Sequence, residues 1–359
     1  MLARLKGKMA FSAIVVTLRL RSAVAVAAVC LSIWLIACAS GVPPPEACAD
    51  DDRELRLGFY AYFAPVSHSA DGEEGSPGFD VHQGYEADLL TALEAMDGVR
   101  VSFSRRGIGS WDDIWLASVG PEFDVIGGGI TVLGSRTRDA QGREAVVFTS
   151  GHIAFRQSLL VRAEDESRFT DYNDVTSDVQ VGALAGTTGE ARLLELTGLT
   201  NSNGALVAGA IIETPRGEVV ADGASNYRIT AAGASENLAG RRRIRPSADN
   251  MPEVVYFGNQ LGETELLAAL SDGRIDALAR GEVGNREAEH ASGDAFVVAL
   301  LDDAVERGGF TFDVADAALA ACLSDRIDFL TDEMTVGYAD WLQDPSVFMR
   351  RAEIWNGRQ

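Results

Sequence analysis

Residues 123–136, with the sequence FDVIGGGITVLGSR, combine residue types that can hold a small anion. The apolar start predicts a buried strand, and the three glycines at 127–129 allow the backbone to approach a ligand closely. Thr131 adds a hydroxyl group, and Arg136 carries a guanidinium that can hold a carboxylate through two parallel hydrogen bonds. The segment therefore predicts a binding site for a small anionic molecule at the end of a strand.

Structural interpretations of these residues stay open. Arg136 could form a surface ion pair with Asp139 or Glu144, and the glycines could form an ordinary turn. Arg138 is a second candidate for holding the anion, but the five-residue spacing from Thr131 favours Arg136. A phosphate-binding P-loop matches poorly, because no Gly-Lys-Ser or Gly-Lys-Thr follows the glycines.

A second anion-binding segment is expected at Thr187 and Thr188. They follow a predicted strand at 179–183 and precede a predicted helix at 190–196. The free amide groups and the dipole of a helix start favour an anion there. N-capping by either threonine is the structural alternative, and it is compatible with ligand binding.

Composition and charge limit the function classes. The chain has 359 residues, 47% of them hydrophobic and 23% charged, which suits two domains with ample core. Its formal net charge of −22 argues against a nucleic-acid partner, because phosphate contacts require clusters of Lys and Arg. The acidic residues do not form long blocks, so a solvated acidic surface is the expected arrangement.

The N-terminal segment has the pattern of an export signal. A basic region precedes an apolar run at 23–37 that is short for a membrane span, and the run ends in Leu-Ile-Ala-Cys38. This end resembles a bacterial lipobox, which implies a signal peptide at 1–37, lipidation of Cys38 and a tether at 38–53. A plain cut near Ala47 and an uncleaved anchor are the alternatives. Each interpretation places the body outside the cytoplasm, in the periplasm or at the cell surface.

Two cysteines remain in the exported body, Cys48 and Cys322. In an oxidising compartment they could form a disulfide that ties the start of the body to a C-terminal helix. Two unpaired buried thiols are the alternative.

The apolar patterns predict alternating strands and helices, and hence an α/β fold with mostly parallel sheets. The expected organisation is a first lobe from 54–158, a second lobe from 159–292 with an insertion at about 197–252, and a return to the first lobe at 293–359. Strands are expected at 55–60, 99–104, 123–126, 179–183, 254–257 and 275–279, with extended segments at 145–161. Helices are expected at 84–96, 111–119, 190–196, 264–270, 317–329 and 333–341.

Several motifs occur in the order seen in the periplasmic solute-binding proteins of amino-acid ABC importers, the family-3 type, and the chain resembles that family from about 55 to 283. The similar segments are Phe63-Ala64-Pro65-Val66, the helix start at 84–89, Trp111, Gly129-Ile130-Thr131 with Arg136, the segment 146–150, the strand and turn at 181–188, and the strand at 273–278.

The resemblance implies two lobes of the type II binding-protein fold, joined by two crossovers, with a solute held in the cleft. It implies a small anionic or zwitterionic solute, an ABC permease as partner, a monomer anchored to the membrane by lipid, and no cofactor. One departure concerns the aspartate that pairs with the solute's ammonium in the family. Gly281 stands at that position, with Glu282 beside it. Either a one-residue shift lets Glu282 pair with the ammonium, or the solute has no α-ammonium. The implied ligand-binding residues are Phe63, Trp111, Gly129, Thr131, Arg136, Thr187, Thr188 and Glu282.

Other functions have less support. Phe63 and Trp111 could be core residues, and the histidines His68, His82, His152 and His290 have no metal-binding spacing. A periplasmic dehydratase acting on a cyclic carboxylic acid is one alternative, with Glu190 or Glu282 as general acid. A ligand-sensing lipoprotein without a transporter is another.

Overall fold

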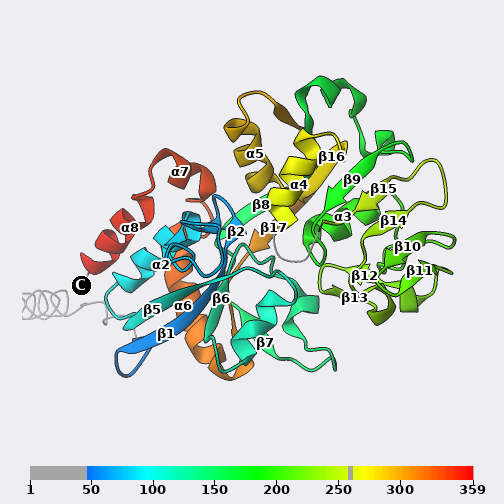
Figure 1. The fold of residues 1–359 in the computed structure, drawn as a ribbon. Helices are drawn as coiled ribbons and strands as arrows, with labels where there is room; N and C mark the ends of the chain where they lie inside the picture. The colour runs from blue at the N-terminus through cyan, green and yellow to red at the C-terminus, as the bar shows by residue number, and fades with distance from the viewer. Residues whose placement is uncertain (1–46, 258–261, 359) are drawn as a thin grey trace, which may run out of the picture. The chain divides into compact units, whose positions relative to one another are not determined.

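The computed structural model describes residues 47–257 and 262–358. The predicted signal peptide at 1–37 and the lipidation site Cys38 therefore lie outside the described residues. The described part contains two large mixed sheets, each with its own hydrophobic core, and helices pack beside both (Figure 1). None of the helices in these ranges is both long enough and apolar enough to cross a membrane.

The first sheet has the strand order β5-β1-β6-β18-β7. β1 pairs in parallel with β5 and β6, as the strand-helix-strand pattern predicts, whereas β18 pairs antiparallel with β6 and β7. The last four residues of β1 are all buried, as expected of a central strand covered on both faces. The strands are β1 (Arg53–Tyr60), β5 (Val101–Ile108), β6 (Val125–Gly127), β7 (Val146–Phe148) and β18 (Thr311–Asp313).

The second sheet has the order β11-β10-β14-β15-β9-β16-β8-β17. Only the β15-β9 and β9-β16 pairs are parallel, so this sheet is less parallel than predicted. The insertion adds antiparallel strands at one edge, and the two crossover strands form an antiparallel pair at the other. The strands are β8 (Ile153–Arg162), β9 (Gln180–Ala183), β10 (Ile211–Thr214), β11 (Gly217–Val220), β14 (Arg243–Arg245), β15 (Glu253–Val255), β16 (Ala277–Gly281) and β17 (Phe296–Gly308).

The strands β8 and β17 carry the chain between the two sheets (Figure 1). β8 lies in the predicted extended segment, but β17 was not predicted. Its first half is apolar and its second half is charged, so it lacks the alternation that marks a strand. Register shifts between Val298 and Leu300 and between Leu301 and Val305 disturb the pattern further.

Helices cover the sheets, and the C-terminal ones pack near α2 in the first lobe. The predicted helix at 333–341 begins later, because Asp332, Glu333 and Met334 all have positive φ and end α6. α8 was not predicted. The helices are α2 (Tyr85–Glu94), α3 (Thr188–Leu196), α4 (Gly262–Ser271), α5 (Glu282–Ala291), α6 (Ala317–Thr331), α7 (Tyr338–Gln343) and α8 (Val347–Asn356).

Short elements complete the fold. The segment at 111–119, predicted as a short helix, contains the 3₁₀ helix η1 (Ile114–Val119). Two small sheets are formed by β2 (Tyr62–Phe63), β3 (Ser67–Ser69) and β4 (His82–Gln83), and by β12 (Ile229–Thr230) and β13 (Gly233–Ala234). Further 3₁₀ helices are η2 (Gly134–Thr137), η3 (Ala163–Arg168), η4 (Tyr172–Asp174), η5 (Ser225–Tyr227), η6 (Glu236–Leu238) and η7 (Val314–Asp316).

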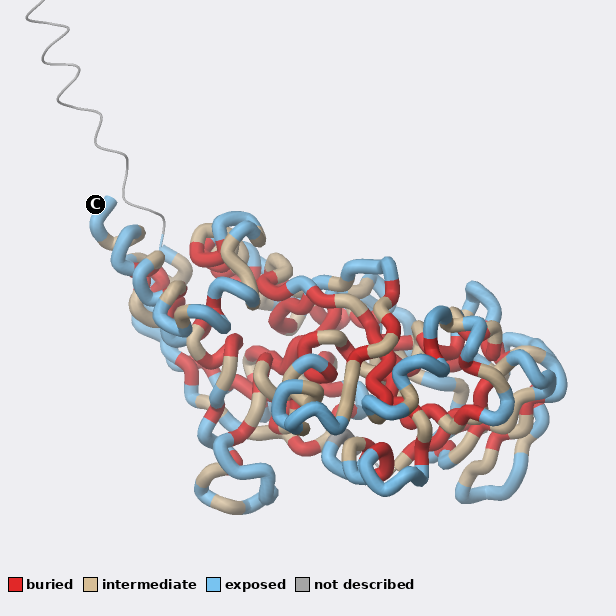
Figure 2. Tube along the Cα trace, turned by 90° about the horizontal axis from the view of Figure 1, so that it is seen from above, coloured by how far each residue is buried: buried red, intermediate tan, exposed pale blue. Residues whose placement is uncertain are grey.

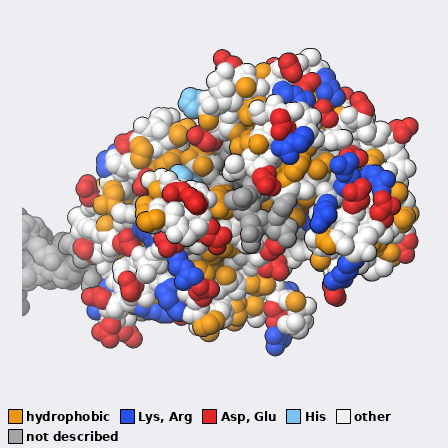
Figure 3. All heavy atoms as spheres, viewed as in Figure 1, with side chains coloured by type: hydrophobic (Ala, Val, Ile, Leu, Met, Phe, Trp, Pro, Cys, Tyr) orange, Lys and Arg blue, Asp and Glu red, His pale blue; other side chains and the backbone are white. Residues whose placement is uncertain are grey.

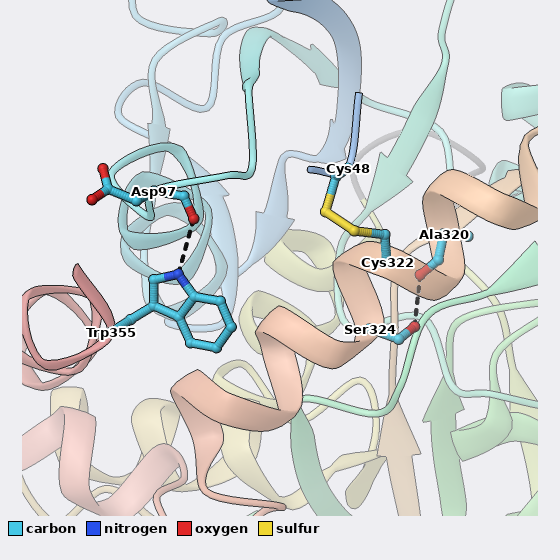
Figure 4. Close-up of a disulfide and its surroundings, with 6 residues drawn as sticks. All are labelled: Cys48, Asp97, Ala320, Cys322, Ser324 and Trp355. Atoms are coloured by element: carbon cyan, nitrogen blue, oxygen red, sulfur yellow. Dashed lines mark hydrogen bonds between the residues drawn. A yellow bond between two sulfur atoms is a disulfide. The ribbon is translucent and has the colours of Figure 1, made fainter. Parts of the chain in front are cut away.

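Cys48 and Cys322 form a disulfide with a Cα–Cα distance of 5.4 Å (Figure 4). It ties the start of the body to α6, as the paired alternative predicted. The Cys48 amide also donates to the Gly98 carbonyl at 2.9 Å, and Arg100 binds Asp52 at 3.0 Å. The last residues of the predicted tether are therefore fixed to the first lobe.

The insertion belongs to the second lobe rather than projecting from it. Its strands β10, β11 and β14 extend the second sheet, and its apolar side chains Leu206, Ile212 and Ile244 are buried in that lobe's core. Buried stretches run through the interior in Figure 2, and exposed ones lie at the outer turns. On the face in Figure 3, acidic and arginine side chains are interspersed rather than gathered into patches of one sign.

Candidate functional site

A small cavity lies where the two lobes meet. Its volume is about 50 Å³, which is room for a few water molecules. Aromatic rings form much of the wall, and hydroxyl and amide groups converge from both lobes and from β8. The lining residues are Tyr60, Phe63, Trp111, Gly129, Thr131, Phe155, Gln157, Leu184, Thr187, Thr188, Gly189, Leu266, Leu278, Ala279, Arg280 and Gly281.

The glycine turn after β6 brings the first lobe's backbone to this cavity. Gly128 and Gly129 have φ of +132° and +67°, and a Cβ at Gly129 would lie 2.6 Å from the Phe63 ring. The buried Glu86 carboxylate accepts hydrogen bonds from the amides of Gly128 at 2.7 Å and Gly129 at 2.8 Å. His152 also contacts this carboxylate, at 2.9 Å. Glu86 therefore fixes the turn from behind.

Thr131 leaves the turn with its hydroxyl facing the second lobe. It donates to the Glu306 Oε2 atom at 2.9 Å and lies 3.3 Å from the Thr188 hydroxyl. A backbone bridge joins Thr131 to Gly308 at the end of β17. Thr131 thus connects the first lobe, a crossover strand and the start of α3.

Arg136 is fully buried but does not line the cavity, which differs from the predicted arrangement. Its Nε donates to the Ala231 carbonyl at 2.9 Å, and its Nη atoms donate to the carbonyls of Thr131 and Gly186, each at 3.3 Å. Its guanidinium lies 4.5 Å from the centre of the Trp115 ring. Two of these carbonyls belong to the second lobe, including one from the insertion, so Arg136 joins the lobes.

The charge of Arg136 is poorly compensated. Among the described residues, no carboxylate lies within ion-pair distance of its guanidinium. Burial lowers its pKa to about 10, against the opposing influence of the more distant Glu306 and Asp113. A buried cation that contacts only carbonyl groups and aromatic rings can be stabilised further by an anionic partner.

The second lobe contributes the start of α3. Thr187 is its N-cap, accepting from the Glu190 amide at 3.1 Å, and its hydroxyl donates to the Leu184 carbonyl at 2.8 Å. Thr188 accepts a hydrogen bond from the Gln157 amide nitrogen at 2.9 Å. Both threonines line the cavity, and the capping role of Thr187 accompanies that placement.

The turn before α3 is held by a buried cluster around Glu190. The Glu190 carboxylate accepts from the Gly186 amide at 2.7 Å, from Arg241 at 2.7 Å and 2.6 Å, and from the Tyr256 hydroxyl at 2.7 Å. Arg241 comes from the insertion and begins a run of three arginines, a pattern that is typical of a surface. Arg241 is instead 8% exposed, and it supports the turn that carries Thr187.

Two of the predicted aromatic residues lie at the cavity. Phe63 forms part of the cavity wall, with its ring edge-to-face with Phe155 at a centroid distance of 6.3 Å. Trp111 also lines the cavity, and its indole nitrogen donates to the Gly186 carbonyl across the lobes at 3.1 Å. Trp111 also packs against Tyr60 in the core.

Gly281 lines the cavity, but Glu282 does not. The Glu282 carboxylate lies at the start of α5 and pairs with Arg156 at 3.3 Å and Arg286 at 3.9 Å. The one-residue shift that would bring Glu282 to the cleft is therefore not seen, because β16 ends at Gly281 and the next side chain meets arginines instead.

Sequence reasoning missed Glu86, Gln157 and Glu306. The acid at the start of a predicted helix was a weak signal for Glu86, since a carboxylate there complements the helix dipole. Gln157 and Glu306 stand in the crossover strands outside any motif. Within the described ranges, no group of three or more His, Cys, Asp and Glu side chains is arranged to hold a metal ion.

Comparisons with known proteins concern the fold. No protein-family model matches the chain, and no curated protein sequence matches it significantly. Among solved structures, a similar one is an amino-acid ABC transporter substrate-binding protein from Streptococcus pneumoniae bound to L-arginine. It has a TM-score of 0.51 and 16% identity, covering 84% of this chain and 94% of that chain.

Two further solved structures each have a TM-score of 0.50. The substrate-binding protein of an amino-acid ABC transporter is 14% identical, covering 84% of this chain and 99% of that one. An ancestral amino-acid-binding protein, described as a precursor of cyclohexadienyl dehydratase, is 19% identical, covering 84% and 95%. The chain therefore has the two-lobe α/β fold of the periplasmic solute-binding proteins, whose solved structures it resembles at low sequence identity.

Proposed function

We propose that this protein captures a small carboxylate-bearing solute, an amino acid or a related compound, outside the cytoplasm. The observation that supports this function is a cavity at the junction of two lobes, closed by hydrogen bonds that run between them. Trp111 and Arg136 of the first lobe donate to the Gly186 carbonyl of the second, and Thr131 meets Thr188. Such contacts break when the lobes separate and form again when they close on a solute.

In this proposal Arg136 binds the carboxylate of the solute. Its guanidinium now contacts carbonyl groups of Thr131 and Gly186, next to cavity residues Thr131 and Thr187. A carboxylate can replace these carbonyl groups, because charge-assisted bonds to an arginine fork are stronger than bonds to neutral acceptors. Thr131, Thr187 and Thr188 then supply further polar contacts, and Phe63 and Trp111 cover the solute's body.

The small cavity indicates a closed conformation, so entry of an amino acid requires the lobes to open or the lining side chains to move. We infer that solute-dependent closure signals occupancy to an ABC permease in the membrane. Lipidation at Cys38 would hold the monomeric protein at the membrane surface beside that permease. Adjacent genes for a permease and an ATPase would favour transport over a transporter-independent sensor.

The two carboxylates considered as general acids for a dehydratase, Glu190 and Glu282, are held by other residues. Glu190 is held by Arg241, Tyr256 and the Gly186 amide, and Glu282 is paired with Arg156 and Arg286. Neither carboxylate lines the cavity. Binding without chemistry is therefore the function that this geometry supports best.

A thermal-shift screen of amino acids, polyamines and organic acids tests the proposal. We expect an amino acid or organic acid to give the largest rise in melting temperature. Arg136→Met should remove that rise, whereas Arg138→Ala, at an exposed arginine paired with Glu144, should preserve it. Circular dichroism would establish that both variants are folded. A folded Arg136→Met variant that still responds to the same compound would contradict the assigned role of Arg136.

A further inference from the structure

The cavity lacks an acidic side chain at the position where the resemblance implies an ammonium-binding aspartate. Gly281 stands there, and a Cβ at Gly281 would lie 3.5 Å from the rings of both Phe63 and Phe155. Glu282 is directed to Arg156 and Arg286. A solute that carries an ammonium group must therefore find its hydrogen-bond acceptors elsewhere in the cavity.

Gln157, on β8, offers one such acceptor. The residue is 4% exposed, and its Nε2 atom donates to the Thr188 hydroxyl at 2.9 Å and to the Glu306 carboxylate at 3.0 Å. A carboxylate can only accept hydrogen bonds, so it fixes the amide with nitrogen towards Glu306 and oxygen away from it. That oxygen has no hydrogen-bond partner.

The unpaired oxygen of Gln157 is buried against the cavity wall. An ideal Cβ built on Gly189, a residue of the cavity wall, would be 3.1 Å from it. Buried acceptors without a donor are uncommon, because the group loses its hydrogen bonds to water on folding. A donor on a bound solute would satisfy this atom.

Glu306, on β17, supplies negative charge behind the cavity wall, where it contacts two lining residues without lining the cavity itself. Its Oε2 atom accepts from Thr131 and Gln157, both of which line the cavity. Within the described ranges, no arginine or histidine forms an ion pair with it. Glu306 is also the β-partner of Phe155 in the β8-β17 pairing, which places the carboxylate beside an aromatic ring of the wall.

The surrounding rings suit a cation as well. Tyr60, Phe63, Trp111 and Phe155 line the cavity, and the faces of aromatic rings attract positively charged groups. Arg280 also belongs to the lining, and its guanidinium donates to the Asn285 side chain and the Gly284 carbonyl. On this basis, and given the proposed function, we propose that Gln157 and Glu306 form the subsite for a protonated amine of the solute. The two crossover strands thus replace the carboxylate missing at Gly281, and the solute class narrows to amino acids or related amino compounds.

Matched ligands test the proposal by titration calorimetry on the full chain in detergent. One set is L-leucine, 4-methylpentanoate and 3-methylbutan-1-amine, and a second is L-phenylalanine, 3-phenylpropanoate and 2-phenylethylamine. A third is L-arginine, 5-guanidinopentanoate and agmatine. In the set that binds, we expect the amino acid to bind the unaltered protein at least about tenfold tighter than the analogue without the amine. This comparison needs no variant.

Variants then assign the preference to residues. Glu306→Gln and Gln157→Met should each weaken binding of the amino acid about ten- to a hundredfold and change binding of the amine-free analogue by less than about threefold. Glu54→Gln makes the same chemical change at an exposed position on β1 and should leave both affinities unchanged. Melting temperatures identify any variant that fails to fold.

The outcomes separate this inference from the proposed function. Equal binding of an amino acid and its amine-free analogue would overturn the amine subsite but leave carboxylate capture intact. Tighter binding of amine-free acids to Glu306→Gln would show instead that Glu306 competes with the solute's carboxylate. Absence of binding by every compound in the three sets and in the solute screen would overturn both proposals.

Discussion

The insertion should be required for the stability of the second lobe, because its Arg241 neutralises the buried Glu190. The Glu190 side chain is 0% exposed, and Arg241 contacts it through two nitrogen atoms at 2.7 Å and 2.6 Å. Arg241→Met keeps much of the aliphatic volume but leaves the carboxylate without a cation. Removal of one partner from a buried ion pair typically costs about 3–5 kcal/mol.

Two remaining donors would not remove this cost. Burial, together with the Glu190 carboxylate, raises the pKa of Tyr256 well above its usual value of 10, so the hydroxyl keeps its proton and donates. The Gly186 amide donates as well. Neither donor carries a positive charge, so we expect Arg241→Met to lower the free energy of unfolding by about 3–5 kcal/mol.

Urea unfolding at pH 7, followed by tryptophan fluorescence, measures this loss. The double variant Arg241→Met/Glu190→Gln removes the charge as well as its partner and should lose only about 1–2 kcal/mol. Arg242→Met, at the exposed neighbouring arginine, should change stability by less than about 0.5 kcal/mol. A loss below about 1 kcal/mol for Arg241→Met, or equal losses in the single and double variants, would refute the reasoning.

Three further predictions concern the turn, the disulfide and pH. Gly129→Ala should destabilise the protein by about 1–3 kcal/mol and weaken solute binding, because its φ is +67° and the new methyl would meet the ring of the cavity wall. Gly142 also has a positive φ, +77°, but a methyl group there would meet no neighbouring atom. Gly142→Ala should therefore destabilise the protein less than Gly129→Ala and leave solute binding unchanged, and calorimetry would measure both effects. Reduction of the Cys48–Cys322 disulfide should lower the unfolding free energy by about 2–5 kcal/mol, measured with and without dithiothreitol, and an unchanged midpoint would contradict this. Burial holds the pKa of His82 well below 6.5, so the unfolded chain binds the proton first and stability should fall as pH drops below 6.5. This one group can change the free energy of unfolding by at most about 1.4 kcal/mol per pH unit. Between pH 7.5 and 5.5, the free energy of unfolding of His82→Gln should therefore fall less than that of the unaltered protein.

Local sequence patterns were sufficient for several elements of the site. The predicted strand at 179–183 and the following threonines correspond to β9 and the start of α3, because strand propensity and helix capping depend on neighbouring residues. The three glycines after β6 form a turn with positive φ at Gly128 and Gly129, as the permissive backbone of glycine suggested.

Contacts between distant residues could not be predicted in this way. The Ala231 carbonyl meets Arg136 from 95 positions away, and Glu306 meets Thr131 from 175 positions away. No spacing in the sequence indicates either contact, since each depends on how the lobes and the insertion pack. The burial of Arg241 could not be predicted for the same reason. Three consecutive arginines are typical of a surface, and only the contact with the buried Glu190 carboxylate places one of them in the interior.

The crossover strands carry the proposed amine subsite and also connect the two lobes. Phe155 and Gln157 are two residues apart on β8, so their side chains lie on the same face of the strand, and Glu306 on β17 is the β-partner of Phe155. In the proposed closure, these strands are also the connections about which the lobes bend. A solute that contacts Gln157 and Glu306 therefore contacts the hinge itself, and closure on an amine would order the strands that set the angle between the lobes. Deletion of a residue at the β17 register shift between Leu301 and Val305, remote from the cavity lining, should accordingly change the solute's dissociation rate more than the protein's preference among amine-bearing compounds. Stopped-flow measurements on a variant with Asp303 deleted would detect that difference, and a change in selectivity with unaltered dissociation would contradict the coupling.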